Sequence, residues 1–271
     1  MGAIGLVDGP CDAGLSATER VGVAAAARSG DTAGMNENQS VFKSLLPGFA
    51  AEFMGTFALV FFGAGSMIMA SDQFGAGNLV TIALAHGLVL VVFVSACMYI
   101  SGAQFNPAVS IGLIVAGKQT PFRAAVFIFA QLLSAACAAG MLVFLLGAEV
   151  ANNPDAGTEL GATIGQLTRD GNAMGVFGFE FLLTFALMYV ILAAVVDDRA
   201  HKLGGICVGG TVAACIFAAG PLTGASMNPA RTFGPALYGH WDMFHIYVLA
   251  TVLGACAAAL VYRFVTAKDV S

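Results

Sequence analysis

The chain has 271 residues, of which 58% are apolar and only 10% are charged, with a formal net charge of −5 and a mean hydropathy of +0.85. A soluble globular domain carries about 25% charged residues, so these numbers argue strongly against a cytosolic enzyme, a nucleic-acid-binding protein and a disordered chain. They leave a membrane protein with several spans. The 34 glycines then need an explanation, because glycine is unfavourable in an isolated helix but permits close helix crossings in a membrane.

The first 44 residues differ from the rest of the chain, because residues 8–40 are mostly small and polar. They do not combine a basic start with an apolar core, so they do not match a signal peptide. We therefore expect residues 1–44 to form a disordered extension. Met35 is an alternative translation start within it.

Six apolar stretches follow, each close to the length of about 20 residues that a helix needs to cross a bilayer. They lie near residues 49–70, 78–100, 121–147, 173–196, 203–220 and 243–266. Two further apolar stretches, near 106–116 and 228–238, are too short to cross, and each begins at an Asn-Pro pair. We expect these two to be re-entrant segments of a single channel domain at 45–268.

The basic residues predict the orientation, because lysine and arginine concentrate on the cytoplasmic side of membrane proteins. With the N-terminus inside, nine of the eleven basic residues fall on that side. The exceptions are Arg169, in the long loop 148–172, and Arg231. We therefore expect a multi-pass protein of the plasma membrane with both termini in the cytoplasm.

The two halves of the chain resemble each other, and we place the copies at about 45–147 and 173–266. The pattern x-Glu-Phe-x-x-Thr-Phe-Ala-Leu occurs at 51–59 and again at 179–187, and each half has one Asn-Pro-Ala triplet. Each copy holds three spans and one short segment. Because three is odd, the second copy must be inverted in the bilayer, as in transporters and channels whose interrupted helices meet near the midplane.

The triplets predict the starts of two short helices, since asparagine is a favourable N-cap and proline a favourable first helical residue. Inversion would point the two N-termini, each carrying about half a positive charge, at each other, which repels cations. A water molecule between them would accept hydrogen bonds from the asparagines, which opposes a proton wire. One triplet could be a chance helix start, but two in matching positions indicate a pore. The residues are Asn106, Pro107, Ala108, Asn228, Pro229 and Ala230.

Other polar groups are expected at membrane depth beside these triplets. The preceding loops need a wet cavity, which their carbonyls would line as a ladder of acceptors. The predicted carbonyls are those of Gly102, Ala103, Gln104, Gly224 and Ser226. Glu52 and Glu180 occupy matching positions in two spans, where we expect them to support the loops by hydrogen bonds, with proton relay as the alternative.

With these motifs together, the chain resembles the major intrinsic proteins, the family of aquaporins and aquaglyceroporins, from about residue 45 to 266. The matching residues are Glu52, Ser101-Gly102-Ala103, Asn106-Pro107-Ala108-Val109, Glu180 and the run from Gly224 to Arg231. The resemblance implies an all-α membrane fold, with six transmembrane helices, two re-entrant half-helices and inverted three-helix repeats. It also implies a homotetramer with one pore in each subunit.

The resemblance also implies a selectivity filter, whose residues follow from their spacing to the triplets: His86, Ile216, Ala225 and Arg231. From the sequence alone, His86 could be an ordinary core residue and Arg231 a residue that reaches the membrane interface. The set is similar to that of plant tonoplast-type members. Isoleucine in place of the histidine of strict water channels predicts a wider, more apolar opening that also admits ammonia, urea, hydrogen peroxide or glycerol.

The branch of the family is indicated by two positions. Glycerol facilitators usually carry aspartate directly after the filter arginine and a basic residue four positions later, where this chain has Thr232 and Ala236. This favours a water channel. Gln104, in place of a common histidine, and Tyr247-Val248, in place of an aromatic pair, depart from that branch. A glycerol facilitator and a non-conducting junctional protein remain the alternatives.

The remaining reactive residues do not indicate an enzyme, a cofactor or a metal site. Six cysteines, at positions 11, 97, 137, 207, 215 and 256, form no CxxC pair, and we interpret them as small buried apolar residues. The four histidines do not form a recognisable site. We expect water, small neutral solutes and the lipid bilayer as partners, and no nucleic acid.

Overall fold

The computed structural model describes residues 45–72, 74–200 and 202–266. The predictions of a disordered extension at 1–44 and of an alternative start at Met35 lie outside them. Nearly all of the described residues belong to one compact unit, Pro47–Ser271. The described residues contain helices and turns but no strand.

Six helices are long and apolar enough to cross a membrane, which confirms the predicted fold class. After Leu45–Met69, they are built on α2 (Leu79–Ser101), α4 (Pro121–Leu146), α7 (Ala173–Ile191), α8 (Gly204–Thr223) and α10 (Phe244–Val261). Both α7 and α10 end in a π-helical turn, η3 (Leu192–Val196) and η4 (Tyr262–Thr266). The predicted span boundaries therefore agree with the structure to within a few residues at most ends.

The two short apolar stretches form the half-helices α3 (Pro107–Val115) and α9 (Pro229–Ala236). The side-chain oxygen of Asn106 accepts from the amide of Ala108 at 2.9 Å, and that of Asn228 accepts from the amide of Ala230 at the same distance. Proline follows at the first helical position in both, where an N–H would be unpaired anyway. Asn-Pro therefore begins a helix in each repeat.

The long loop between α4 and α7 is more structured than its sequence indicated. It holds α5 (Ala148–Ala151), two 3₁₀ turns, η1 (Pro154–Ala156) and η2 (Glu159–Gly161), and α6 (Gln166–Arg169). Each of these elements is only three or four residues long, so no apolar periodicity could mark it in the sequence.

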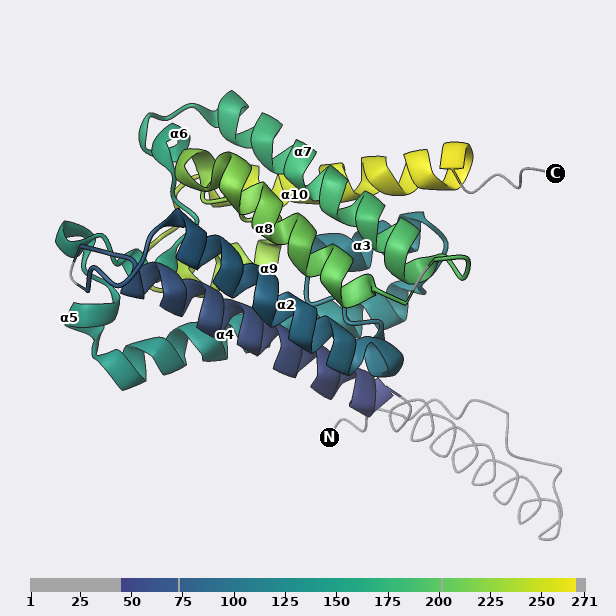
Figure 1. Cartoon of the computed structure of the whole chain (residues 1–271), viewed down its shortest axis with the longest axis horizontal. Helices are drawn as coiled ribbons and strands as arrows, with labels where there is room; N and C mark the ends of the chain where they lie inside the picture. The colour runs from purple at the N-terminus through teal and green to yellow at the C-terminus, as the bar shows by residue number, and fades with distance from the viewer. Residues whose placement is uncertain (1–44, 73, 201, 267–271) are drawn as a thin grey trace, which may run out of the picture. The chain divides into compact units, whose positions relative to one another are not determined.

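The helices pair across the two repeats. Figure 1 shows α2 beside α8 and α7 beside α10, and both are extensive contacts. The half-helix α3 of the first repeat packs on α10 of the second, whereas α9 of the second packs on α4 of the first. Each half-helix therefore rests on a long helix of the other copy, so neither repeat can form the centre of the bundle alone.

Glycine allows the close crossing of α2 and α8. A Cβ atom on Gly87 of α2 would lie 2.9 Å from the carbonyl oxygen of Gly209 of α8, and one on Gly209 would overlap the carbonyl of Gly87. In contrast, a Cβ on Gly210 would meet no atom within 4 Å, so Gly210 serves no close crossing among the described residues. The described cysteines are all free, and Cys137 is exposed on α4 and not buried as expected.

Candidate functional site

The first re-entrant loop is held by the buried carboxylate of Glu52 on the first span. Its Oε1 accepts from the Ser101 hydroxyl at 2.6 Å and from the Gln104 amide at 2.9 Å. Its Oε2 accepts from the Phe105 amide at 2.7 Å and from the side chain of Gln131 on α4 at 2.8 Å. One carboxylate therefore satisfies two backbone donors that would otherwise be unpaired at membrane depth.

Glu180 on α7 makes the corresponding contacts with the second loop. Its Oε1 accepts from the Thr223 hydroxyl at 2.7 Å and from the Ser226 amide at 2.9 Å, and its Oε2 accepts from the Met227 amide at 2.8 Å. Both carboxylates are fully buried. The geometry is that of a loop support, with each glutamate bonded to the backbone of its own repeat.

The two loops share an unusual backbone. After the left-handed glycines Gly102 (φ 91°) and Gly224 (φ 80°), the residues Ala103, Phe105, Ala225 and Met227 all have φ between 45° and 53°. A non-glycine residue in this region costs about 1–2 kcal/mol. The hydrogen bonds to Glu52 and Glu180 offset that cost. Because positive φ values recur at every second residue of each loop, successive peptide groups point in different directions.

The N-cap side chain of each half-helix, Asn106 or Asn228, is hydrogen-bonded to the re-entrant loop of the other repeat. The amide of Asn106 donates to the carbonyl of Met227 at 2.7 Å, and that of Asn228 donates to the carbonyl of Phe105 at 2.8 Å. An asparagine amide has two N–H donors, so each retains a second one. This exchange refines the expectation that all of these donors point into the space between the helices.

One cavity contacts this pair of asparagines, and it shares six lining residues with a second cavity that does not reach them. The first, of about 40 Å³, contacts His86, Ala225 and Arg231 at one end and Gln104 at the other. The second, of about 250 Å³, continues from Gln104 and Ala103 to Gly102, Lys118 and Arg123. The shared residues are Val94, Ala103, Gln104, Val109, Ile191 and Val208. Together the cavities form a candidate path that is mostly apolar on the α2, α7 and α8 side.

Among the predicted carbonyl residues, Gly102, Ala103, Gln104 and Ser226 line these cavities. Gly224 lines neither of them. A Cβ at Gly224 would lie 2.7 Å from the Cα of Thr163, so the residue packs against the loop between α4 and α7. Its left-handed backbone permits the tight turn at the end of α8, and its carbonyl stays a predicted lining group.

Three of the four predicted filter residues come together. The Nε of Arg231 lies 3.4 Å from Nε2 of His86, and the Nδ1 of His86 lies 2.9 Å from the carbonyl of Ile82. A carbonyl only accepts, so Nδ1 carries the hydrogen and Nε2 is free to accept from Arg231. Ala225 lies beside them on the cavity wall. Ile216 is buried on α8 but does not line the cavity, where Val212 takes the place on that helix.

A network of amides near the Lys118 end was not predicted. Gln104 exchanges hydrogen bonds with Gln119, and its side-chain oxygen also accepts from the hydroxyl of Ser110 at 2.6 Å. Gln131 lies 3.2 Å from the same hydroxyl. Glutamines carry no recognisable motif, so only the fold brings these side chains together. In the second repeat, Ser226 and Thr232 contact each other at 2.5 Å in the corresponding place.

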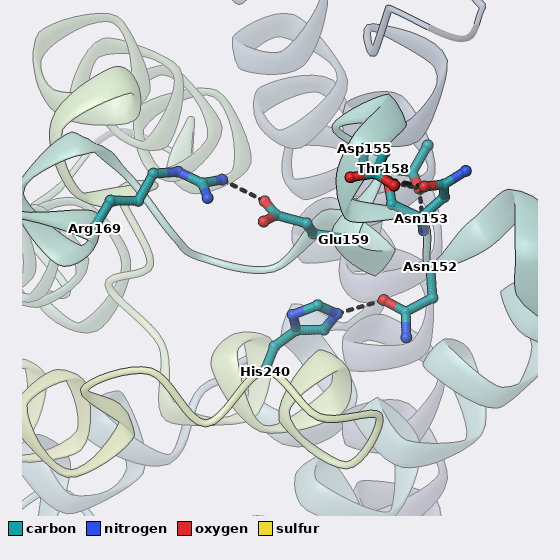
Figure 2. A network of polar contacts seen from close by, with 7 residues as sticks. All are labelled: Asn152, Asn153, Asp155, Thr158, Glu159, Arg169 and His240. Atoms are coloured by element: carbon teal, nitrogen blue, oxygen red, sulfur yellow. Dashed lines mark hydrogen bonds and ion pairs between the residues drawn. The ribbon is translucent and has the colours of Figure 1, made fainter.

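The loop between α4 and α7 lies beside the Arg231 end of the path. Thr163 in this loop donates to the hydroxyl of Thr232 on α9 at 3.1 Å. Figure 2 shows His240, which follows α9, pointing to Asn152 at 2.5 Å, and Arg169 pointing to Glu159 at the same distance. Burial lowers the pKa of His240 below 6.5, so His240 is neutral around pH 7. The loop is therefore fixed to α9 and to the turn behind it.

A family model described as major intrinsic protein matches residues 39–262. Among curated proteins, the chain is 41% identical over 220 residues to Aquaporin TIP4-4 of Zea mays, covering 78% of this chain and 83% of that relative. It is 39% identical over 249 residues to Aquaporin AqpM of Methanothermobacter thermautotrophicus, covering 80% of this chain and 96% of that relative.

Among solved structures, the chain is similar to the X-ray structure of the aquaglyceroporin from Plasmodium falciparum. The TM-score is 0.69 at 27% sequence identity, and the match covers 82% of this chain and 97% of that one. The relatives therefore include proteins named as aquaporins and one named as an aquaglyceroporin.

Proposed function

Because the chain belongs to the major intrinsic protein family, we propose that it is a passive channel for water that also admits small neutral solutes. The observation that carries this proposal is the pair of asparagines, whose amides donate to Met227 and Phe105 across the centre of the bundle. A non-conducting junctional protein would not need this pair, nor a buried arginine beside a cavity. The residual amide donors would orient a passing water molecule as an acceptor.

Exclusion of ions and protons follows from the same arrangement. The N-termini of α3 and α9 each carry about half a positive charge, and Arg231 adds a full charge that is almost completely buried. No acidic side chain lines the cavity beside Arg231 to offset these charges. Glu52 and Glu180 are occupied by loop amides, which favours the loop-support role over proton relay.

The selectivity we propose includes solutes somewhat larger than water. The filter would consist of the predicted set His86, Ile216, Ala225 and Arg231. On α8, Val212 lines the described cavity, and Ile216 would close the filter one helical turn further along. Apart from His86 and Arg231, these side chains offer no hydrogen bond and Ala225 leaves space. Water, ammonia, urea and hydrogen peroxide would therefore pass, with glycerol slower.

A glycerol facilitator is the second candidate, and the similarity to the aquaglyceroporin favours it. Thr232 supports the water branch instead. Its hydroxyl bonds to both Ser226 and Thr163, where an aspartate would place a charge between two hydroxyls. We further propose a homotetramer in the plasma membrane with both termini in the cytoplasm, which places the Lys118 and Arg123 end of the path inside.

Stopped-flow light scattering on proteoliposomes tests the function. Purified protein should raise the osmotic water permeability well above that of empty vesicles, with urea faster than glycerol. Glycerol equilibrating as fast as water would establish the facilitator, whereas water flux equal to that of empty vesicles would overturn the channel itself.

A further inference from the structure

The first span forms a surface behind the filter, one helical turn long. Gly63 and Met67 are four residues apart and therefore lie on the same face of this helix. A Cβ on Gly63 would lie 2.5 Å from Nε2 of His86 and 2.8 Å from its Cδ2. The imidazole thus occupies the space that any larger residue at position 63 would fill.

Met67 contacts the other filter side chain. Its sulfur lies 2.8 Å from Nη2 of Arg231, whose Nε lies 3.4 Å from Nε2 of His86. The remaining guanidinium nitrogen, Nη1, is buried without a hydrogen-bond partner among the described residues. The guanidinium is therefore held on two sides, by His86 and by the first span.

We propose that Gly63 and Met67 are positioning residues of the filter, which set its aperture by holding His86 and Arg231 back against the first span. His86 and Arg231 line the cavity, whereas Gly63 and Met67 do not. They act through these two side chains and not by touching the solute. The proposal rests on the proposed channel function. It extends the filter to the first span, a helix that holds none of the predicted filter residues.

The mechanism at Gly63 is a displacement. The imidazole is the end of a side chain and can rotate, so alanine at position 63 would move the ring and leave the helix intact. The first span blocks one side, which leaves movement toward the cavity. That movement would also strain the Nδ1 bond to Ile82 and the contact with Arg231.

Gly63→Ala tests this step by the ratio of urea to water permeability. We expect the ratio to fall about tenfold, the discrimination that one methyl group can give in a close-fitting site. Gly65→Ala is the matched control on the same helix, because its Cβ would make only an ordinary contact of 3.6 Å with Leu142. In the double variant Gly63→Ala with His86→Ala, the ratio should equal that of His86→Ala alone.

Met67 is tested by two substitutions of similar size. Met67→Leu removes the sulfur, so the guanidinium loses its anchor and should turn into the path, lowering the ratio of urea to water permeability. Met67→Gln supplies an acceptor again and should restore the ratio. An equal loss in both variants would overturn the assignment of Met67.

The outcomes separate this inference from the channel function. Wild-type protein without water flux would refute the function, whereas a conducting wild type with an unchanged ratio in Gly63→Ala would refute only the positioning role. The positioning role would also be refuted if the urea-to-water ratio fell further in Gly63→Ala with His86→Ala than in His86→Ala alone. An equal fall in Gly65→Ala would refute it too. Size-exclusion profiles of each variant identify any loss that comes from misfolding.

Discussion

Gly87 and Gly209 cross backbone to backbone where α2 meets α8, and they are 122 positions apart, the same offset as Asn106 and Asn228. Alanine at position 209 would overlap the Gly87 carbonyl and the side chain of Val91. We expect Gly209→Ala to destabilise the folded protein by about 1–3 kcal/mol, as overpacking does elsewhere. Thermal unfolding in detergent measures the effect.

Gly210→Ala is the control for this prediction, since a Cβ at that position meets nothing within 4 Å. Its melting temperature should equal that of the wild type or exceed it, because alanine is the better helix former. Equal melting temperatures for the two variants would show that the α2–α8 crossing does not depend on a bare backbone.

Glu52→Gln should weaken the first loop, because an amide nitrogen would replace an oxygen that accepts a hydrogen bond. At least one of the donors on Gln104, Phe105 and Gln131 would then be buried without a partner, at a cost of about 1–3 kcal/mol. We expect lower thermal stability together with lower water permeability per folded protein. The proton-relay alternative predicts a different result: an unchanged melting temperature with an altered proton flux, which a pH-sensitive dye inside vesicles would report.

Much of this architecture could be predicted because it depends on local chemistry. The spans follow from the length of apolar stretches, and the half-helices follow from Asn-Pro, which favours a helix start wherever it occurs. The repeated Glu-Phe and Asn-Pro-Ala patterns then predicted two copies that are inverted in the bilayer. Each of these inferences needs only neighbouring residues or an internal comparison.

The contacts that could not be predicted depend on how each helix is rotated about its axis. Gln131 reaches Glu52 over 79 positions, and Met67 reaches Arg231 over 164. Neither glutamine nor methionine belongs to a motif, so spacing alone cannot pair them. Gly210 shows the same dependence, since it follows Gly209 directly but lies on another face of α8, where a Cβ would meet nothing.

The loop between α7 and α8 contains a contact between Asp197 and Arg199 that depends on the ionised form of the Asp197 carboxylate. The guanidinium of Arg199 and the hydroxyl of Tyr262 hold the pKa of Asp197 well below its usual 3.8. A lowered native pKa stabilises the contact at every pH above about 3.8, and the stabilisation is lost only as the pH falls from there toward the native pKa. We expect amide hydrogen exchange at Arg199, whose N–H donates to Asp197 at 3.0 Å, to show constant protection between about pH 5 and pH 8 after correction for intrinsic rates.

Substitution separates this contact from general loop mobility. Asp197→Ala should abolish the protection of the Arg199 amide across that pH range, whereas Asp198→Ala, a change at its exposed neighbour, should leave it intact. Protection that falls steeply between about pH 7 and pH 5 in the wild type would assign the contact to a group other than this carboxylate.

The filter assignment makes the sharpest prediction about selectivity. Arg231→Val with His86→Ala removes a buried charge and an imidazole that contact each other at 3.4 Å, so the solute would meet a wider and more apolar opening. We expect glycerol permeability to rise by about tenfold or more, since each lost contact of this kind changes discrimination by at least that factor. Arg263→Val, which removes an exposed arginine away from the two cavities, should leave glycerol permeability unchanged. Because the asparagine pair and the two helix N-termini remain in the double variant, vesicles should still hold a proton gradient. Unaltered glycerol permeability in the double variant would mean that the narrowest point lies elsewhere, with the Gln104–Gln119 pair as the next place to test.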